Sequence, residues 1–287
     1  MPYFGACFSP YFIGSPYRPP MDVPEDIVGM AMSIMAQQKF THIRTYSCVG
    51  RNKYNVKLAR KHGLKVGLGI WVVPGDSANN QAALLEGWNQ VSQAPGVVVD
   101  LVVGNEVNRQ DNFHFTPSEI QSLIEFAKGK KPANVDVRVT TCFSGTVLQD
   151  SPEWGSAVDA CESVVYLTVY PWYGGADPTN IQPQMDWSWD NGLKQVVARG
   201  KKIVIAEIGW PSAGGRLTTP ANEKANYEAT KTFFLGGTSP HFALDTYWFE
   251  MYDEWWKTAE GAQGPHWGLF TGGPAPDPKW SPWPTGR

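Results

Sequence analysis

The sequence predicts an α/β fold, a single (β/α)8 barrel. Short apolar runs typical of buried strands recur along the whole chain, helix-like segments separate them, and successive runs begin roughly 24–40 residues apart. The eight runs cover residues 4–9, 41–47, 65–72, 99–106, 136–143, 164–170, 202–208 and 243–250.

The intervals between the runs carry helix signals. "PEDIVGMAMSIMAQQ" (24–38) has apolar residues at helical spacing, and "KYNVKLARKHG" (53–63) ends on a glycine suited to a helix C-terminus. "FTPSEIQSLIEFAKGK" places Thr116 as an N-cap, and Glu119 completes a capping box. "TTPANEKANYEATKTFF" (218–234) opens with the same Thr-Pro pair. These signals supply the helices that the barrel requires.

The competing architecture is a doubly wound parallel sheet. Such a sheet needs a G-x-G-x-x-G turn after an early strand, and "GLGIWVV" (67–73) is only a partial match inside the third run. No linker or internal repeat divides the chain. We therefore expect one catalytic domain over residues 1–287, with a Pro- and Gly-rich tail from about residue 271.

Composition narrows the class of ligand. The net charge of −3 offers no basic field, so nucleic acid and anionic membranes are not expected partners. No apolar run approaches the roughly 18–20 residues that span a bilayer. The 13 Trp are unusual, and many lie beside Pro, Gly or Asp, as in "PWYGG" and "DWSWD". Aromatic side chains in loops suit ligands with apolar faces and polar rims, such as sugars.

Cysteine and histidine spacing gives no sign of a metal or cofactor. The four cysteines show no C-x-x-C spacing, and the five histidines fall in no ligand pattern. We expect buried free thiols, with a Cys7–Cys48 bridge as the alternative. No signal peptide is recognised, since strand-like sequence begins at once. The chain is therefore either intracellular or a mature domain. Of these two, we expect a secreted or cell-wall protein, and we expect it to be a monomer. The cysteines are Cys7, Cys48, Cys142 and Cys161.

Two of the predicted strands end in a glutamate. "VVVDLVVG" runs into Asn105 and Glu106, and "KKIVIAEIGWPS" places Glu207 at the end of another buried run. The carboxyl ends of barrel strands share one mouth, where barrel enzymes carry their chemistry. A single strand-end glutamate is explained by a structural role, in which it pairs with an arginine or accepts hydrogen bonds from the backbone. Two at one mouth, with Asn105 adjacent and Trp210 just beyond, indicate a catalytic pair.

The expected separation of the two carboxyl groups permits glycoside hydrolysis. Strands about 4.8 Å apart close into a ring whose radius is about 7–8 Å, so the fourth and seventh strands lie roughly 14 Å apart. Two inward side chains then leave about 6 Å between the carboxyl groups. This distance lies between the retaining (about 5–5.5 Å) and inverting (about 6.5–9.5 Å) ranges, so it does not decide the stereochemistry.

Three motifs resemble those of glycoside hydrolase family 17, the (β/α)8 enzymes active on β-1,3-glucan, in its fungal or bacterial type. They are "VVGNEV", "AEIGWPS" and "FEMYDEWWK…GPHWGLF", and the likeness runs in register from "YFGACFSPY" to "HWGLF". The resemblance implies a retaining, double-displacement mechanism. Carried onto this chain, it makes Glu106 the acid/base and Glu207 the nucleophile.

This mechanism demands different protonation states of the two glutamates. Glu106 has to give a proton to the leaving oxygen and later take one back, so its pKa should be raised. Glu207 has to be ionised to attack the anomeric carbon. Asn105 is expected to bond the sugar 2-hydroxyl, and Tyr170, in "TVYPWY", to donate to Glu207.

Five further residues are candidates near the cleft. Arg44 and Tyr46 end the second predicted strand, and Arg44 either holds one of the two glutamates ionised or only braces the barrel. Glu254 and Lys257 match an acidic–basic pair of family 17, and their spacing also suits a helical ion pair, so a structural or substrate-orienting role is expected. Glu250 departs from the small residue of plant-type members, and we expect it to contact the sugar.

The segment after the sixth strand bears on the second half of the reaction, in which either water or a sugar hydroxyl takes the glycosyl group from Glu207. It carries several aromatic residues, and some of them, with Trp154, are expected to form a platform for an acceptor sugar. A strong platform favours transglycosylation, which makes the chain a β-1,3-glucanosyltransferase acting on β-1,3-glucan or laminari-oligosaccharides. The segment's aromatic residues are Trp172, Tyr173, Trp187 and Trp189.

Three alternatives remain open. The first is a purely hydrolytic endo-β-1,3-glucanase. The second is a carbohydrate-binding barrel without catalysis, which the retention of both carboxylates makes a poor explanation. The third is a sugar-phosphate barrel, for which "PSAGGRLTT" (211–219) offers Gly and Arg after the seventh strand, although an aromatic mouth suits neutral sugars better.

Overall fold

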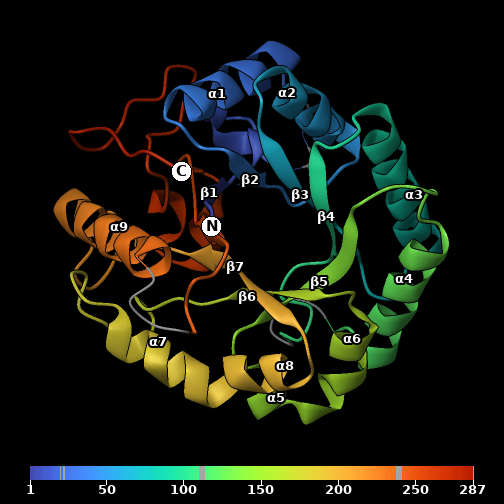
Figure 1. The fold of residues 1–287 in the computed structure, drawn as a ribbon. Helices are drawn as coiled ribbons and strands as arrows, with labels where there is room; N and C mark the ends of the chain where they lie inside the picture. The colour runs from blue at the N-terminus through green and yellow to red at the C-terminus, as the bar shows by residue number, and fades with distance from the viewer. Residues whose placement is uncertain (20, 22, 110–113, 237–240, 287) are drawn as a thin grey trace.

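The computed structural model describes residues 1–19, 21, 23–109, 114–236 and 241–286. Eight parallel strands close into a barrel in the order β1 to β8, and helices surround it (Figure 1). The predicted (β/α)8 barrel is confirmed, and each predicted run overlaps one strand. The strands are β1 (Phe4–Cys7), β2 (His42–Arg44), β3 (Lys65–Ile70), β4 (Val98–Val103), β5 (Arg138–Ser144), β6 (Val164–Thr168), β7 (Lys202–Ile208) and β8 (Thr246–Trp248).

The helices form where the sequence signals placed them. Thr116 accepts a hydrogen bond from the Glu119 amide at 3.2 Å, and Glu119 returns the bond, so the predicted capping box is present. Thr219 caps the last long helix in a similar way. The helices are α1 (Glu25–Gln37), α2 (Asn55–Lys61), α3 (Ser77–Gln93), α4 (Pro117–Gly129), α5 (Val147–Asp150), α6 (Gly155–Ala160), α7 (Gln182–Ser188), α8 (Lys194–Ala198) and α9 (Pro220–Leu235).

The barrel interior contains polar groups as well as apolar ones. Toward the amino ends of the strands, Arg138 makes a two-pronged contact with Asp100 at 2.6 and 2.8 Å, and Tyr166 donates to the same carboxylate at 2.8 Å. Asp100 is fully buried, and its charge is balanced by this arginine. This network fills the interior of the barrel toward the amino ends of the strands.

The four cysteines are free and buried, as expected. The alternative Cys7–Cys48 bridge is wrong. The Cys7 thiol lies inside the barrel, 3.3 Å from the Ala206 carbonyl oxygen, whereas the Cys48 thiol lies 3.3 Å from the carbonyl oxygen of Ala83 on α3. The barrel wall therefore separates the two sulfur atoms.

The Pro- and Gly-rich tail lies along the outside of the barrel. Tyr227 of α9 donates to the Thr285 carbonyl at 2.8 Å, and the Gly286 amide donates to the Gln38 carbonyl at 3.0 Å. The tail thus joins α9 to the end of α1. Within the described ranges, no helix combines the length and apolarity needed to cross a membrane.

Candidate active site

The two glutamates lie at the carboxyl ends of β4 and β7, which open onto the same mouth of the barrel. Glu207 is in β7, paired in register with Thr168 at the end of β6. Glu106 follows β4 after a tight turn, in which Gly104 has φ +79° and Glu106 itself has φ +46°. This left-handed conformation is unusual for a residue with a side chain. It marks Glu106 as a position where the surrounding structure fixes the backbone.

Three donors fix the carboxylate of Glu207. Arg44 Nη1 lies 2.5 Å and the Tyr46 hydroxyl 3.0 Å from Oε1, and the Tyr170 hydroxyl lies 2.6 Å from Oε2. Glu207 is 3% exposed and Arg44 is 1% exposed. Burial and the nearby carboxylate raise the pKa of Tyr170, which keeps its hydroxyl protonated as a donor. These contacts orient the Glu207 carboxyl group and place the positive charge of Arg44 beside it.

Arg44 also resolves one of the alternatives left by the sequence. Its Nη1 contacts Glu207, and its Nη2 donates to Oδ1 of Asn105 at 2.6 Å. The arginine thus pairs with the β7 glutamate and orients the amide beside the β4 glutamate. Because the Asn105 oxygen is taken by Arg44, its NH2 group is the part of the amide suited to donate to a sugar hydroxyl.

Glu106 has a different environment. Thr168 Oγ1 donates to its Oε1 at 2.6 Å, and Arg109 Nη1 lies 3.2 Å from its Oε2. Burial is the main cause that raises the pKa of Glu106, and the charge of Glu207 adds to it, while Thr168 and Arg109 act in the opposite direction. The net direction is the one that a proton donor at neutral pH requires.

Thr168 and Arg109 are contacts that the sequence interpretation missed. Thr168 shares the inward face of β6 with Tyr166, because alternate strand residues point to the same side. Arg109 follows Glu106 by three residues, the spacing of a turn-closing pair. Both signals were available in the sequence.

A buried ion-pair network stands beside this mouth. Lys257 Nζ lies 2.8 and 2.7 Å from the two oxygens of Glu250 and 2.7 Å from Glu254, which also accepts from Ser9 at 2.5 Å. Glu250 is 1% exposed and both of its oxygens bind Lys257, and its contact with the sugar stays a prediction. The predicted Glu254–Lys257 ion pair is present.

The aromatic residues after β6 divide into two groups, one of which lies at the mouth. Tyr170, Trp172 and Tyr173 surround the buried Trp267, with ring centroids 5.3–6.1 Å from it. Trp172 is half-buried, and its indole N–H donates to the Arg216 carbonyl at 2.9 Å. Tyr173 is 63% exposed. This cluster presents aromatic surface next to Glu207, which binds the hydroxyl of Tyr170.

The other predicted aromatic contacts are corrected by the structure. Trp210 is fully buried and donates to the Leu217 carbonyl at 3.0 Å, and Trp154 is buried against Phe143. Trp189, which follows α7, stacks on His241 with ring centroids 4.1 Å apart, and His241 lies in the segment that leads into the amino end of β8. Burial thus keeps Trp154 and Trp210 in the interior, whereas the half-buried Trp189 lies against His241, away from the mouth.

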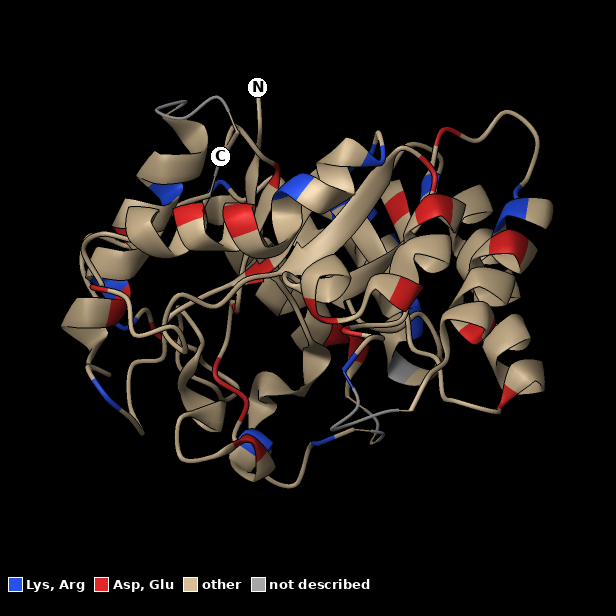
Figure 2. Cartoon of the chain, turned by 90° about the horizontal axis from the view of Figure 1, so that it is seen from below, with Lys and Arg blue, Asp and Glu red and all other residues tan. Residues whose placement is uncertain are grey.

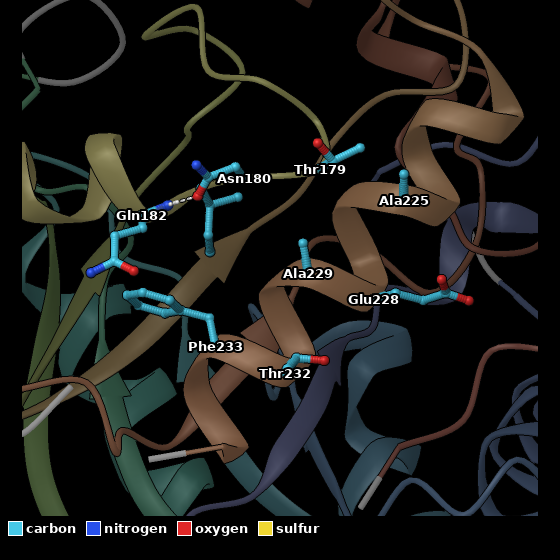
Figure 3. Close-up of a pocket in the computed structure, with 9 residues that line it drawn as sticks. Thr179, Asn180, Gln182, Ala225, Glu228, Ala229, Thr232 and Phe233 are labelled. Atoms are coloured by element: carbon cyan, nitrogen blue, oxygen red, sulfur yellow. Dashed lines mark hydrogen bonds between the residues drawn. The ribbon is translucent and has the colours of Figure 1, made fainter. Parts of the chain in front are cut away.

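The hollow in Figure 3 is separate from this site. About 470 Å³ in volume, it lies between the chain that enters α7 and the outer face of α9, with Asn180, Gln182, Glu228 and Thr232 among its lining. No candidate site residue lines it. Across the described residues, no cluster of His, Cys, Asp and Glu is suited to hold a metal ion.

Most of the sequence matches one family of enzymes. Residues 5–268 match the family model described as the BtgE/BtgC glycoside hydrolase domain. The chain belongs to the BtgE/BtgC glycoside hydrolase family. The candidate glutamates, Glu106 and Glu207, both lie within the matched region.

Curated members related to this BtgE/BtgC domain are longer proteins. The chain is 22% identical over 222 residues to the probable glucan endo-1,3-beta-glucosidase btgC of Aspergillus terreus, covering 71% of this chain and 32% of that protein. It is 27% identical over 219 residues to the probable beta-glucosidase btgE of the same fungus, covering 73% and 36%. The chain therefore spans about a third of the length of these relatives.

Solved structures share the fold of this BtgE/BtgC domain. An endo-laminarinase from Formosa Hel1_33_131 superimposes with a TM-score of 0.77 at 17% identity, covering 94% of this chain and 83% of that one. The glycoside hydrolase family 17 beta-1,3-glucanosyltransferase from Rhizomucor miehei gives 0.71 at 19% identity, covering 97% of both. The family match and these neighbours confirm the predicted resemblance to family 17.

Proposed function

We propose that this chain is a retaining glycosidase that acts on β-1,3-glucan by double displacement. The observation that carries the proposal is the contrast between the two carboxyl groups at one mouth. Glu207 accepts three hydrogen bonds, one of them from Arg44, whereas burial raises the pKa of Glu106. One group is thus prepared as an anionic nucleophile and the other as a proton donor.

The first step forms a glycosyl-enzyme. Glu106 gives its proton to the glycosidic oxygen while Glu207 attacks the anomeric carbon, and the electron pair of the breaking C–O bond goes to the departing sugar. In the second step the ionised Glu106 removes a proton from water or from a sugar hydroxyl, whose oxygen displaces Glu207. The Asn105 amide and the Tyr170 hydroxyl stabilise charge during both steps.

The choice of β-1,3-glucan rests on the relatives and on the charge of the chain. A relative bears the name glucan endo-1,3-beta-glucosidase, and a mutant of the Rhizomucor miehei enzyme was solved with laminaritriose. Acidic and basic residues alternate along the chain in the side view of Figure 2, and the net charge is only −3, which suits a neutral ligand. Because a glucan polymer does not cross membranes, we place this activity outside the cell or in the cell wall. Because one chain carries both glutamates, we expect the protein to act as a monomer.

The cluster around Trp267 favours transglycosylation. Tyr173 offers an exposed ring where an acceptor sugar can stack, and tight acceptor binding lets a sugar hydroxyl compete with water. We therefore expect products longer than the starting laminari-oligosaccharide at early times, as well as shorter ones. Shorter products alone would indicate the purely hydrolytic endo-glucanase, and an unchanged sugar would contradict the substrate assignment.

Matched variants test the aromatic platform. Tyr173→Ala should lower the ratio of transfer to hydrolysis several-fold, because alanine removes stacking that contributes about 1 kcal/mol. Trp189→Ala is the control, since Trp189 stacks on His241 away from the mouth. Chromatography of products over time measures the ratio. A ratio that is equal in Tyr173→Ala and in the wild type would exclude the platform.

A further inference from the structure

Arg109 is held beside the candidate acid/base by a short turn. The Arg109 amide donates to the Glu106 carbonyl at 2.9 Å, and Asn108 exchanges two hydrogen bonds with Ser144 of β5, at 2.7 and 2.8 Å. These contacts anchor the turn after β4 to the neighbouring strand. The guanidinium that they carry lies 3.2 Å from Oε2 of Glu106.

The two oxygens of Glu106 are not equivalent. Thr168 donates to Oε1 at 2.6 Å, so that oxygen already serves as an acceptor for a hydroxyl group. The proton that Glu106 transfers is therefore expected on Oε2, which is the atom that Arg109 contacts. A glycosidic oxygen that takes this proton has to approach the same atom. The substrate and Arg109 compete for it.

We propose that Arg109 is a positioning residue that pairs with Oε2 of Glu106 in the empty site and yields that atom to the bound sugar. The inference rests on the proposed role of Glu106. The Arg109 side chain is 42% exposed, whereas that of Glu106 is 15% exposed. Water can therefore take the place of the guanidinium at Oε2 when the side chain moves aside. Its departure removes a positive charge from Glu106 just before the proton is needed.

The proton balance of the cycle follows from this exchange. In the free enzyme Arg109 favours ionised Glu106. Bound sugar displaces the guanidinium, and Oε2 of Glu106 takes up a proton from solvent. Glu106 then passes this proton to the departing oxygen. In the second step the proton of water or of the acceptor hydroxyl returns to Oε2. It leaves for solvent when the product departs and Arg109 re-forms its contact.

Other titratable groups face this pair from the surrounding elements. Glu207 of β7 raises the pKa of Glu106 through its negative charge. Burial raises the pKa of Tyr170, which follows β6, and raises that of Cys142 on β5 to about 12, so both stay neutral across the working range. Tyr173 and Glu260 lie near enough to feel the Arg109 charge. Arg109 is therefore the group whose removal most directly changes the charge at Oε2.

The test compares Arg109→Met, Arg109→Lys and the wild type in the pH dependence of kcat/KM on laminaripentaose. Because Glu106 has to be protonated in the first step, activity falls as pH rises through its pKa. Loss of the cation should move this alkaline limb upward by about 0.5 to 1 pH unit in Arg109→Met. Arg109→Lys keeps a charge and should restore most of the limb. Arg199→Met is the control, because it removes a partly exposed ion pair with Asp159 on the outer helices. This variant should leave the alkaline limb at its wild-type position.

A direct titration makes the test independent of turnover. Carboxyl ¹³C NMR of protein labelled at glutamate, with Glu106 assigned by its absence in Glu106→Gln, should show the same upward shift in Arg109→Met. Equal midpoints in Arg109→Met and the wild type, or an equal shift in Arg199→Met, would overturn the inference. A wild-type protein that does not act on laminaripentaose would contradict the proposed function, while the NMR midpoints still decide the Arg109–Glu106 contact.

Discussion

The contacts of Glu207 show how one side chain is prepared for nucleophilic attack. A carboxylate that is almost fully buried is stable only when charge and hydrogen bonds compensate the lost water. Arg44 supplies the charge, and the hydroxyls of Tyr46 and Tyr170 supply hydrogen bonds to both oxygens. The same donors fix the direction in which the carboxylate can attack.

The Tyr170 hydroxyl is expected to contribute to catalysis rather than to stability. In Tyr170→Phe the ring still packs against Trp267, but one donor to Glu207 is lost. A hydrogen bond to a charged group is worth about 1.5–3 kcal/mol, so kcat/KM should fall about 10- to 100-fold. Steady-state kinetics on laminaripentaose measures the loss.

Tyr166→Phe is the matched control for that variant. Tyr166 is also an inward-facing tyrosine of the β6 segment, but its hydroxyl donates to Asp100 at the opposite end of the barrel. Its loss should lower stability with little change in kcat/KM. Equal losses of kcat/KM in the two variants would show that the Tyr170 hydroxyl has no special role at the site.

At the scale of elements, the segment after β8 is held by buried charges. Lys257 binds both Glu250 and Glu254, and all three side chains are at most 7% exposed. An arrangement with two acids and one base leaves an excess of negative charge, and burial raises the pKa of Glu250. The network therefore joins the end of β8 to the turn that carries Lys257, and Ser9 links it to the segment after β1.

Lys257→Met should destabilise the protein in a pH-dependent way. Two buried carboxyl groups lose their cation, which costs about 3–5 kcal/mol near neutral pH. Burial already raises the pKa of Glu250, and loss of the cation raises it further above that of the unfolded chain. Folding is therefore weakened at high pH, and the penalty shrinks as pH falls and Glu250 becomes protonated in both states. Urea unfolding at pH 5 and pH 8 should therefore show the larger loss at pH 8.

A surface ion pair provides the comparison. Lys194→Met removes an exposed pair with Asp190, with side chains 48% and 67% exposed, and should change the unfolding free energy by less than about 0.5 kcal/mol at both pH values. If Lys257→Met behaved like Lys194→Met, the buried network would have no role in holding the β8 segment.

At the scale of the whole molecule, the sequence predicts the barrel well and the loops poorly. Strands covered on both faces read as continuous apolar runs, so their positions and order follow from the sequence. Glu106 and Glu207 follow from those positions, because each stands where such a run ends. The contact of Tyr170 with Glu207 was expected largely from the resemblance to family 17, whereas the partner of Arg44 was left open and is found in Glu207.

The tryptophans show where this kind of prediction fails. Trp172 and Trp210 both lie in Pro- and Gly-rich segments, yet Trp172 is half-buried at the mouth and Trp210 is completely buried. Their fates depend on which backbone carbonyl each indole finds, Arg216 in one case and Leu217 in the other. Loops have no regular sequence pattern that would indicate which distant backbone group a side chain meets. The sequence therefore could not distinguish the half-buried position of one tryptophan from the buried position of the other.

The central claim, that Glu207 is the nucleophile of a retaining enzyme, is tested most directly by trapping the glycosyl-enzyme. The protein is incubated with a 2-deoxy-2-fluoro laminaribiosyl fluoride, and the intact mass and peptide map are measured. We predict one added fluoro-disaccharide per chain, attached to Glu207 and absent in Glu207→Gln. A label on another residue, or inverted product stereochemistry by ¹H NMR with no trapped species, would contradict the claim.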